Sequence, residues 1–278
     1  MEQRSFGSAV RVSVLGAGCA RVGSISNPVP LRETEATLKA AIEAGINVFD
    51  TADIYGQGDS ERTLGRLLRR DRDRMFIITK VGHDLARYAA AIRIAKPLLR
   101  IVAQSRSDTQ SVVLQARTRA ISQNFYTPRL RGAIEGSRRR LGLDQLDALL
   151  LHSPSLETLR NPEIHDFLAE LLDSGQAARV GASVESLAEV EAALTMPAIT
   201  MLQIPVVVAN ELSDTVALEQ IRWRKIGVFV RGVLSGSVAG ARPLREAVRA
   251  AIAPDFVTAA IIGVSTRRHL NELLSAVS

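Results

Sequence analysis

Four polar residues end or follow apolar segments of strand length, and their types suit proton transfer to a carbonyl oxygen. Asp50 follows INVF, Lys80 follows FIIT, His152 follows ALLL, and Tyr55 lies five residues beyond Asp50. A tyrosine, with a reference pKa of about 10, needs a neighbour that favours its ionised form before it can transfer a proton at neutral pH. A lysine held by an aspartate is such a neighbour, and a histidine can donate a hydrogen bond to the substrate oxygen. Together the four residues predict a carbonyl-reduction site in which Tyr55 is the general acid.

Each of these residues, taken singly, also has a structural explanation. The aspartate can cap a turn and pair with the lysine, the histidine can be a satisfied core residue, and the tyrosine can anchor a loop.

The remaining histidines, His83, His165 and His269, do not sit at strand ends with such partners, so no metal site is expected. Cys19 is the only cysteine, which excludes an intrachain disulfide and a zinc site built on several thiolates.

The positions of the four residues depend on a regular alternation of short apolar and longer amphipathic segments. Strand candidates lie at residues 12–15, 46–49, 75–79, 148–151, 179–182, 201–206, 227–230 and 259–262. Helix candidates lie at residues 33–44, 61–70, 128–141, 162–174, 185–194, 214–224, 244–253 and 267–277. Strands that are apolar at nearly every residue are typical of a parallel sheet covered on both faces, so this order predicts a (β/α)8 TIM barrel. The alternative is a doubly wound sheet, and a barrel would bring the four polar residues to one mouth at the C-terminal strand ends.

Local signals refine this interpretation. Thr127 and Asn161 each precede a proline and predict the N-caps of two helices, and Ser60 is expected to open another helix whose first turn is acidic. The segment MEQRSFGSAV before the first strand is expected to form a short hairpin that plugs the bottom of the barrel. We expect the whole chain, residues 1–278, to be one barrel domain.

One long segment interrupts the alternation after the third strand. Residues 84–126 separate that strand from the third helix and are far longer than a typical βα loop. We expect an insertion at the barrel mouth, either a lid that excludes water or a decoration that favours solubility or oligomer formation. The sequence of residues 84–126 matches no pattern that predicts its structure.

The charge distribution argues against nucleic acid as a partner. The chain carries a formal net charge of +6, but residues 84–140 alone contain 12 Lys or Arg and 3 Asp or Glu, so the rest carries about −3. The basic segment lacks aromatic interleaving and any helix-turn-helix or RNA-binding signature.

No apolar run approaches the roughly 18 residues of a membrane span, and the opening MEQRSFGSAVR is charged. We therefore expect a cytoplasmic protein that binds neither nucleic acid nor membrane, with its oligomeric state left open.

The glycines after the first strand candidate invite a dinucleotide-binding interpretation of the Rossmann type. In that motif the third glycine follows the second by three residues and opens a helix. Here Gly23 follows Gly18 by five residues and SISNPVP comes next, which is incompatible with a helix. Gly16 and Gly18 are instead expected to form a tight turn where the backbone can approach a ligand.

Four segments closely resemble the aldo-keto reductase family. They are FDTADIYGQGDSERTLGRLL, FIITKVG, SRRRLGLDQLDALLLHSPS and AAIIGVSTRRHLNEL, which occur in the family's order across nearly the whole chain. The resemblance implies an NADPH-dependent reductase of aldehydes or ketones on a (β/α)8 barrel. It places Asp50, Tyr55, Lys80 and His152 at the family's catalytic tetrad, with a small-molecule carbonyl compound as substrate.

The resemblance also implies a set of cofactor contacts. Ser183 and Gln203 fall where the family holds the nicotinamide carboxamide, residues 231–240 where it wraps the pyrophosphate, and residues 262–273 where it binds the adenosine 2′-phosphate and adenine. The implied contacts are Gly18, Cys19, Ser183, Gln203, Arg231, Gly232, Val233, Gly236, Gly263, Ser265, Arg268, His269 and Glu272.

Three positions depart from the family pattern. Val206 replaces a tyrosine that stacks on the nicotinamide, while Val184 and Leu273 replace asparagines. Each loss would weaken cofactor binding by about 1 kcal/mol. These departures motivate an alternative function, an NADPH-binding regulatory or interaction protein with little catalytic activity.

Overall fold

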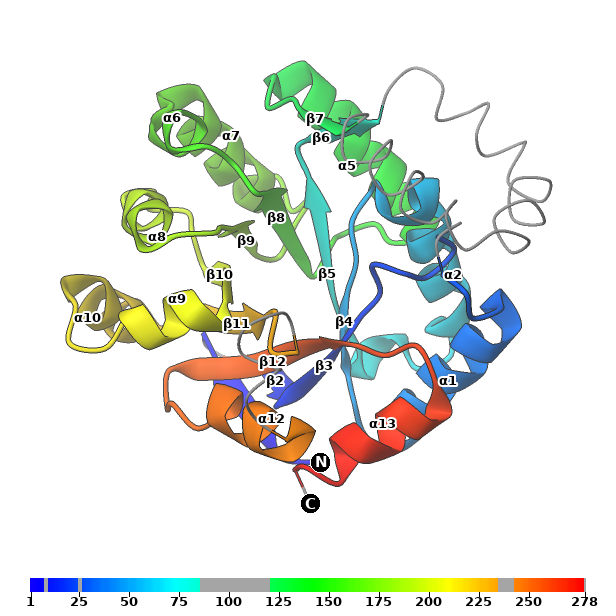
Figure 1. Cartoon of the computed structure of the whole chain (residues 1–278). Coiled ribbons are helices and arrows are strands. Elements are labelled where there is room, and N and C mark those ends of the chain that lie inside the picture. Colours follow the sequence, from blue (N-terminus) through cyan, green and yellow to red (C-terminus); the bar gives the residue numbers. More distant parts are fainter. Residues whose placement is uncertain (8–9, 25–26, 86–120, 235–242, 278) are drawn as a thin grey trace.

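The computed structural model describes residues 1–7, 10–24, 27–85, 121–234 and 243–277, and in them eight parallel strands close into a barrel (Figure 1). The barrel strands are β3 (Leu15–Gly18), β4 (Val48–Asp50), β5 (Phe76–Val81), β8 (Ala148–His152), β9 (Val180–Ser183), β10 (Met201–Pro205), β11 (Gly227–Arg231) and β12 (Val257–Gly263). Each strand pairs in parallel with the next in chain order, and β12 returns to β3. The predicted (β/α)8 barrel is confirmed and the doubly wound alternative is excluded.

Helices surround the barrel and cover the outward faces of the strands (Figure 1). The eight that match the predicted helices are α1 (Leu31–Glu43), α2 (Asp59–Leu67), α5 (Thr127–Leu141), α7 (Pro162–Asp173), α8 (Leu187–Leu194), α10 (Val216–Trp223), α12 (Leu244–Ile252) and α13 (Arg267–Leu274). Four short helices in the described part of the chain were not predicted: η1 (Tyr55–Gly58), η2 (Arg72–Arg74), α6 (Leu156–Arg160) and α9 (Val206–Glu211). No helix in the described ranges is long and apolar enough to cross a membrane.

Two of the three predicted helix starts need correction. The side chain of Asn161 accepts a hydrogen bond from the backbone amide of Glu163 at 2.9 Å, as expected of an N-cap. Thr127 is not a cap, because it lies inside the first turn of α5 and its hydroxyl donates to Glu163 instead. Ser60 also lies inside its helix, where its buried hydroxyl contacts that of Thr51 at 2.8 Å.

An antiparallel hairpin closes the N-terminal end of the barrel, as predicted. Its strands are β1 (Gln3–Phe6) and β2 (Val10–Ser13), and Phe6 packs edge-on against Phe76 and Phe229 with ring centroids 5.6 and 5.5 Å apart. The predicted position of the first barrel strand, residues 12–15, is wrong, because β3 spans Leu15–Gly18. The run VSVLGAG has a single polar residue, so the sequence does not show that the hairpin ends at Ser13 and the barrel begins at Leu15.

The insertion begins and ends in a two-stranded antiparallel ribbon, β6 (His83–Leu85) and β7 (Ile121–Gln123), which the sequence did not predict. Asp84 fixes the ribbon, because its carboxylate accepts from Asn124 at 2.8 Å and from Arg129 on α5 at 2.6 Å. The predicted lid segment between the two strands lies outside the described residues.

Candidate active site

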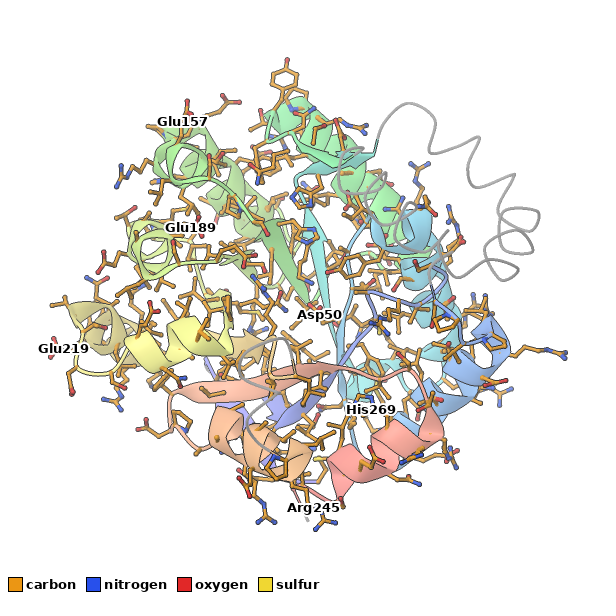
Figure 2. The ribbon with its side chains drawn as sticks, viewed as in Figure 1. Asp50, Glu157, Glu189, Glu219, Arg245 and His269 are labelled. Atoms are coloured by element: carbon orange, nitrogen blue, oxygen red, sulfur yellow. The ribbon has the colours of Figure 1, made fainter. Side chains whose placement is uncertain are left out.

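The four residues predicted to act together lie at the C-terminal end of the barrel. Asp50 ends β4, Lys80 lies near the end of β5, His152 ends β8, and Tyr55 begins η1 immediately above β4. In Figure 2, Asp50 lies near the centre of the barrel, whereas Glu219 and Arg245 lie at its periphery.

A buried ion pair forms the base of this cluster. The Lys80 Nζ atom donates to Asp50 Oδ1 at 2.5 Å and to the Thr51 carbonyl at 2.9 Å, and the lysine side chain is only 1% exposed. Burial acts to lower the pKa of Lys80, but the Asp50 carboxylate and the nearby Tyr55 outweigh it and hold this pKa above its ordinary value. Lys80 is therefore a permanently charged ammonium at neutral pH.

Tyr55 lies directly over this ammonium, with Lys80 Nζ 5.3 Å from the centroid of its ring. Burial raises the pKa of Tyr55, while Lys80 acts to lower it through its charge and a hydrogen bond, and the net shift is upward. In the protein alone the phenol thus keeps its proton at neutral pH. A protonated phenol beside a fixed ammonium can donate to an oxygen that gains negative charge, because the ammonium stabilises the phenolate left behind.

His152 contacts Tyr55 edge-on, with ring centroids 5.8 Å apart and an interplanar angle of 83°. Burial, followed by the charges of Lys80, His83 and Arg231, places the pKa of His152 well below its usual value. Its Nδ1 atom is buried and has no hydrogen-bond partner among the described residues. A proton on Nδ1 would be a buried donor without an acceptor, so these contacts favour a neutral ring with its proton on Nε2.

The expectation that His83 lies apart from the strand-end residues is wrong. Its ring stacks on that of His152, with centroids 4.3 Å apart and 29° between the planes. The chain leaves β5 through Gly82, whose φ of +117° lies in a region that other residues rarely adopt. A Cβ at this glycine would come within 2.2 Å of the Phe125 ring, so its absence permits the close turn that brings His83 back to the mouth.

Asp53 is a second residue that the sequence analysis missed. Its backbone amide donates to the Lys80 carbonyl at 3.1 Å, and its Oδ1 atom is buried without a partner in the described part of the chain. Burial, with a contribution from Glu61, raises the pKa of Asp53 to about 8, although Arg140 and Arg129 act to lower it. The only sequence signal is its position within DTADIYG, between two residues already assigned roles.

Glu61 anchors the segment that carries Tyr55. This fully buried carboxylate accepts from Thr79 Oγ1 and from Arg140 Nε, both at 2.6 Å, and so ties α2 to β5 and α5. The two helices meet closely at Gly65, where a Cβ would lie 2.5 Å from the Leu141 carbonyl oxygen. The SERTLG part of the motif therefore fixes the helix that follows Tyr55.

Two residues predicted to hold the nicotinamide extend the buried hydrogen-bond network of Lys80 and Asp50. Ser183 Oγ donates to Gln203 Oε1 at 3.0 Å, and Gln203 Nε2 donates to Asp50 Oδ1 at 2.8 Å. Gly18 pairs in register with both Asp50 and Gly263, so these positions share the same end of the barrel. The structure thus places five of the expected cofactor and catalytic positions side by side.

The other expected cofactor positions differ in accessibility. Cys19 is fully buried and burial raises its pKa strongly, so it offers no reactive thiolate at the mouth. Arg231 ends β11, donates to the Val184 carbonyl at 3.0 Å and pairs with Glu185 at 2.5 Å. Gly232 and the buried Val233 follow it, and Gly236 lies outside the described residues.

The predicted 2′-phosphate segment surrounds the start of α13. Thr266 is its N-cap and accepts from the backbone amide of His269 at 3.3 Å, with Ser265 immediately before it. Arg268 is 90% exposed and pairs with Glu272 at 3.1 Å. This helix start therefore presents free backbone amides and an exposed guanidinium to the same region of the surface.

The departures from the family pattern have local explanations. Val206 is wrongly assigned to the sixth strand, because β10 ends at Pro205 and Val206 is the first residue of α9. Leu273 is 1% exposed and belongs to the hydrophobic core, as does Val184. All three valine and leucine side chains thus pack against apolar neighbours.

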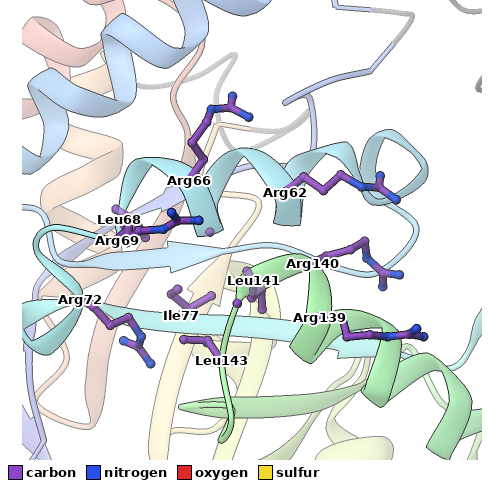
Figure 3. Close-up of a pocket in the computed structure, with 12 residues that line it drawn as sticks. Arg62, Arg66, Leu68, Arg69, Arg72, Ile77, Arg139, Arg140, Leu141 and Leu143 are labelled. Atoms are coloured by element: carbon purple, nitrogen blue, oxygen red, sulfur yellow. The ribbon is translucent and has the colours of Figure 1, made fainter.

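A separate cavity of about 480 Å³ lies between α2 and α5 on the side of the barrel (Figure 3). Six arginines line it: Arg62, Arg66, Arg69, Arg72, Arg139 and Arg140. Arg66, Arg72 and Arg140 are paired with Glu35, Asp147 and Glu61. Because none of the tetrad residues lines this cavity and its arginines are largely paired, we do not assign the chemistry to it. No cluster of three or more potential metal ligands occurs among the described residues.

The comparisons with known proteins give the family of this barrel. The family model of the aldo/keto reductase family matches residues 14–248. The chain belongs to the aldo/keto reductase family.

Among curated relatives, D-threo-aldose 1-dehydrogenase of Pseudomonas sp is 33% identical over 159 residues, 57% of this chain and 45% of that protein. Pyridoxal 4-dehydrogenase of Microbacterium luteolum is 30% identical over 176 residues, covering 63% and 49%. L-galactose dehydrogenase of Arabidopsis thaliana is 29% identical over 156 residues, covering 55% and 38%. The chain spans about half the length of the curated relatives it matches.

Solved structures share the fold over almost the entire chain. An aldo-keto reductase from Bacillus halodurans in its holo form has a TM-score of 0.74 at 21% identity and covers 100% of this chain and 91% of its own. An aldo/keto reductase from Klebsiella pneumoniae in complex with NADP and acetate has a TM-score of 0.66 at 20% identity, covering 98% and 88%. At these identities the likeness establishes the fold alone.

Proposed function

We propose that this protein catalyses the NADPH-dependent reduction of an aldehyde or ketone to an alcohol. The observation that carries the proposal is the buried Lys80–Asp50 pair, which lies beneath a protonated Tyr55 and beside a neutral His152 at the barrel mouth. A cytoplasmic location, expected from the sequence, belongs to the same proposal.

The residues of the cluster have complementary roles in the proposed reaction. Bound NADPH supplies a hydride to the carbonyl carbon. Tyr55 donates its phenol proton to the carbonyl oxygen, and the Lys80 ammonium stabilises the phenolate until a proton from solvent restores the phenol. His152 donates from Nε2 to the same oxygen and orients it. Asp50 keeps Lys80 in place and charged.

The described residues suit this cofactor. Ser183 and Gln203 present hydroxyl and amide groups beside Asp50, where a nicotinamide carboxamide can bind. A Cβ built on Gly263 would meet no atom of the described residues within 4 Å, so these residues leave space beside the end of β12. Arg267 and Arg268 at the start of α13 suit a phosphate group, because backbone amides and the helix dipole add to their charge.

The first prediction is a preference for NADPH over NADH. Arg268→Ala should weaken NADPH binding by about tenfold, because a charge-assisted hydrogen bond to the dianionic 2′-phosphate is lost, and should leave NADH binding unchanged. Titration of the protein with each cofactor, followed by fluorescence, gives the Kd values. Arg245→Ala, an exposed arginine on α12, is the matched control for the lost charge. Equal Kd values for both cofactors in the parent protein and the Arg268 variant would show that these arginines are merely solvated.

The second prediction concerns turnover itself. The protein should consume NADPH with members of a panel of small aldehydes that includes an aromatic aldehyde, pyridoxal and hydroxylated aldehydes, the last two chosen because relatives are named for pyridoxal and aldoses. The assay measures the absorbance of the reduced nicotinamide, with Tyr55→Phe as the background. The alternative, an NADPH-binding regulatory protein, is favoured by Val206 in place of a stacking ring. The regulatory alternative is supported if NADPH binds but no aldehyde is reduced above that background.

A further inference from the structure

The mechanism above does not use His83, although this ring is the one stacked on the proposed hydrogen-bond donor. The two imidazoles lie 4.3 Å apart with 29° between their planes, and Tyr55 meets His152 edge-on at 5.8 Å. No hydrogen bond to His152 Nδ1 fixes its ring within the described residues. Ring contacts therefore orient His152 in place of the hydrogen bond that commonly orients an active-site histidine.

A rigid frame holds His83 in this position. Its neighbour Gly82 adopts a φ of +117° against the Phe125 ring, and His83 pairs in register with Gln123 across the ribbon. Gln123 Nε2 in turn donates to the carbonyl of Ser153 at 2.6 Å, the residue that directly follows His152. The ribbon that carries one imidazole is thus tied to the end of the strand that carries the other.

The protonation state of the two imidazoles determines whether they can stack. The Nδ1 atoms of His83 and His152 are both buried without a partner among the described residues. Protonating either ring to an imidazolium would place an N–H on such an atom, a buried donor without an acceptor. Burial lowers the pKa of His83, and the pKa of His152 lies further below its usual value. As the pH falls, His83 accordingly takes up a proton first.

The charged groups around the pair reinforce this order. Lys80 on β5 and Arg231 on β11 act on His152 and disfavour its protonation. Asp84, the next residue on β6, is engaged by Arg129 and Asn124, and burial lowers the pKa of His83 itself. His83 is half-buried, so its ring can reach water when the stack opens.

We propose that His83 is a positioning residue whose neutral ring holds His152 in place for the substrate oxygen, and that protonation of His83 opens the stack and lowers activity. The inference rests on the proposed function. It adds a residue that acts through another and a pH response built into the ribbon at the base of the insertion.

Kinetic pH profiles of substituted proteins test the proposal. His83→Ala should lower kcat/KM at neutral pH by about tenfold, because His152 is no longer held in a productive orientation. His83→Phe should restore most of that loss, because a flat ring can stack again. The acid limb of kcat/KM reports an essential group of the free enzyme, so in His83→Phe it should move to lower pH, where His152 takes up its proton. His165→Gln, which removes a histidine of α7 that is bonded to the Leu159 carbonyl of α6, is the matched control and should leave the limb in place.

A measurement without cofactor or substrate separates this proposal from the proposed reaction. Imidazole nitrogen resonances of the protein, assigned with single substitutions of its four histidines, should show His152 with its proton on Nε2 and a shift that follows the titration of His83. His83→Phe should abolish that shift. Independent titration of the two rings, or a His83→Ala protein with the parent kcat/KM and acid limb, overturns the proposal. Absence of any turnover in the parent protein instead contradicts the proposed function, while the resonances still decide whether the rings are coupled.

Discussion

Tyr55→Phe lowers kcat for the best aldehyde by about 10²- to 10⁴-fold, the range expected when a general acid is removed. The substitution deletes one oxygen from a side chain whose ring still packs over Lys80 and against His152. Because the ring contacts persist, the fold and the cofactor site are unaffected, and the lost rate reports proton transfer alone. Steady-state kinetics and an NADPH titration of the same preparation measure the two properties separately.

Tyr126→Phe is the matched control for this experiment. Tyr126 precedes α5 and is 67% exposed, so its hydroxyl has no part in the proposed chemistry. The control should keep the parent kcat, and both variants should keep the parent Kd for NADPH. Turnover that survives in Tyr55→Phe would exclude this phenol as the proton donor.

The barrel was predictable because its strands are buried on both faces. Segments such as ALLL and GVFV are apolar at every position, and in these two strands a polar residue appears only at the last position, where the strand reaches the mouth. This contrast, together with the expected barrel, located Asp50, Lys80 and His152. It failed at Ser13, because β2 ends and β3 begins within the mostly apolar run VSVLGAG.

The parts of the site that were not predictable depend on distant packing. His83 reaches the mouth because Gly82 turns against Phe125, a residue more than 40 positions further along the chain. The carboxylate of Asp53 acquires its raised pKa from burial, which its neighbours in sequence do not reveal. The contact between Gln203 and Asp50 joins strands on opposite arcs of the barrel. Residue types and spacing locate a polar group at a strand end, but not the group that it meets.

Lys80→Met should abolish most turnover and also destabilise the fold, and the two losses have different causes. The substitution leaves the Asp50 carboxylate buried with the amide of Gln203 as its remaining described side-chain partner. Removing one member of a buried pair lowers the free energy of unfolding by about 3–5 kcal/mol, because an uncompensated charge stays inside the protein. Loss of the ammonium also leaves the Tyr55 phenolate unstabilised, so kcat should fall about 10²-fold or more. Urea unfolding and steady-state kinetics measure the two effects.

The double substitution Asp50→Asn with Lys80→Met separates these causes. A neutral amide beside a methionine leaves no buried charge, so the urea midpoint should recover most of the loss. Activity should not recover, because no cation then faces the phenol. Arg131→Met breaks an exposed pair with Glu170 and, as a surface control, should hardly change the midpoint. If the double variant regained both stability and turnover, Lys80 would serve only to balance Asp50, and the stabilisation of the Tyr55 phenolate would have to come from another group at the mouth.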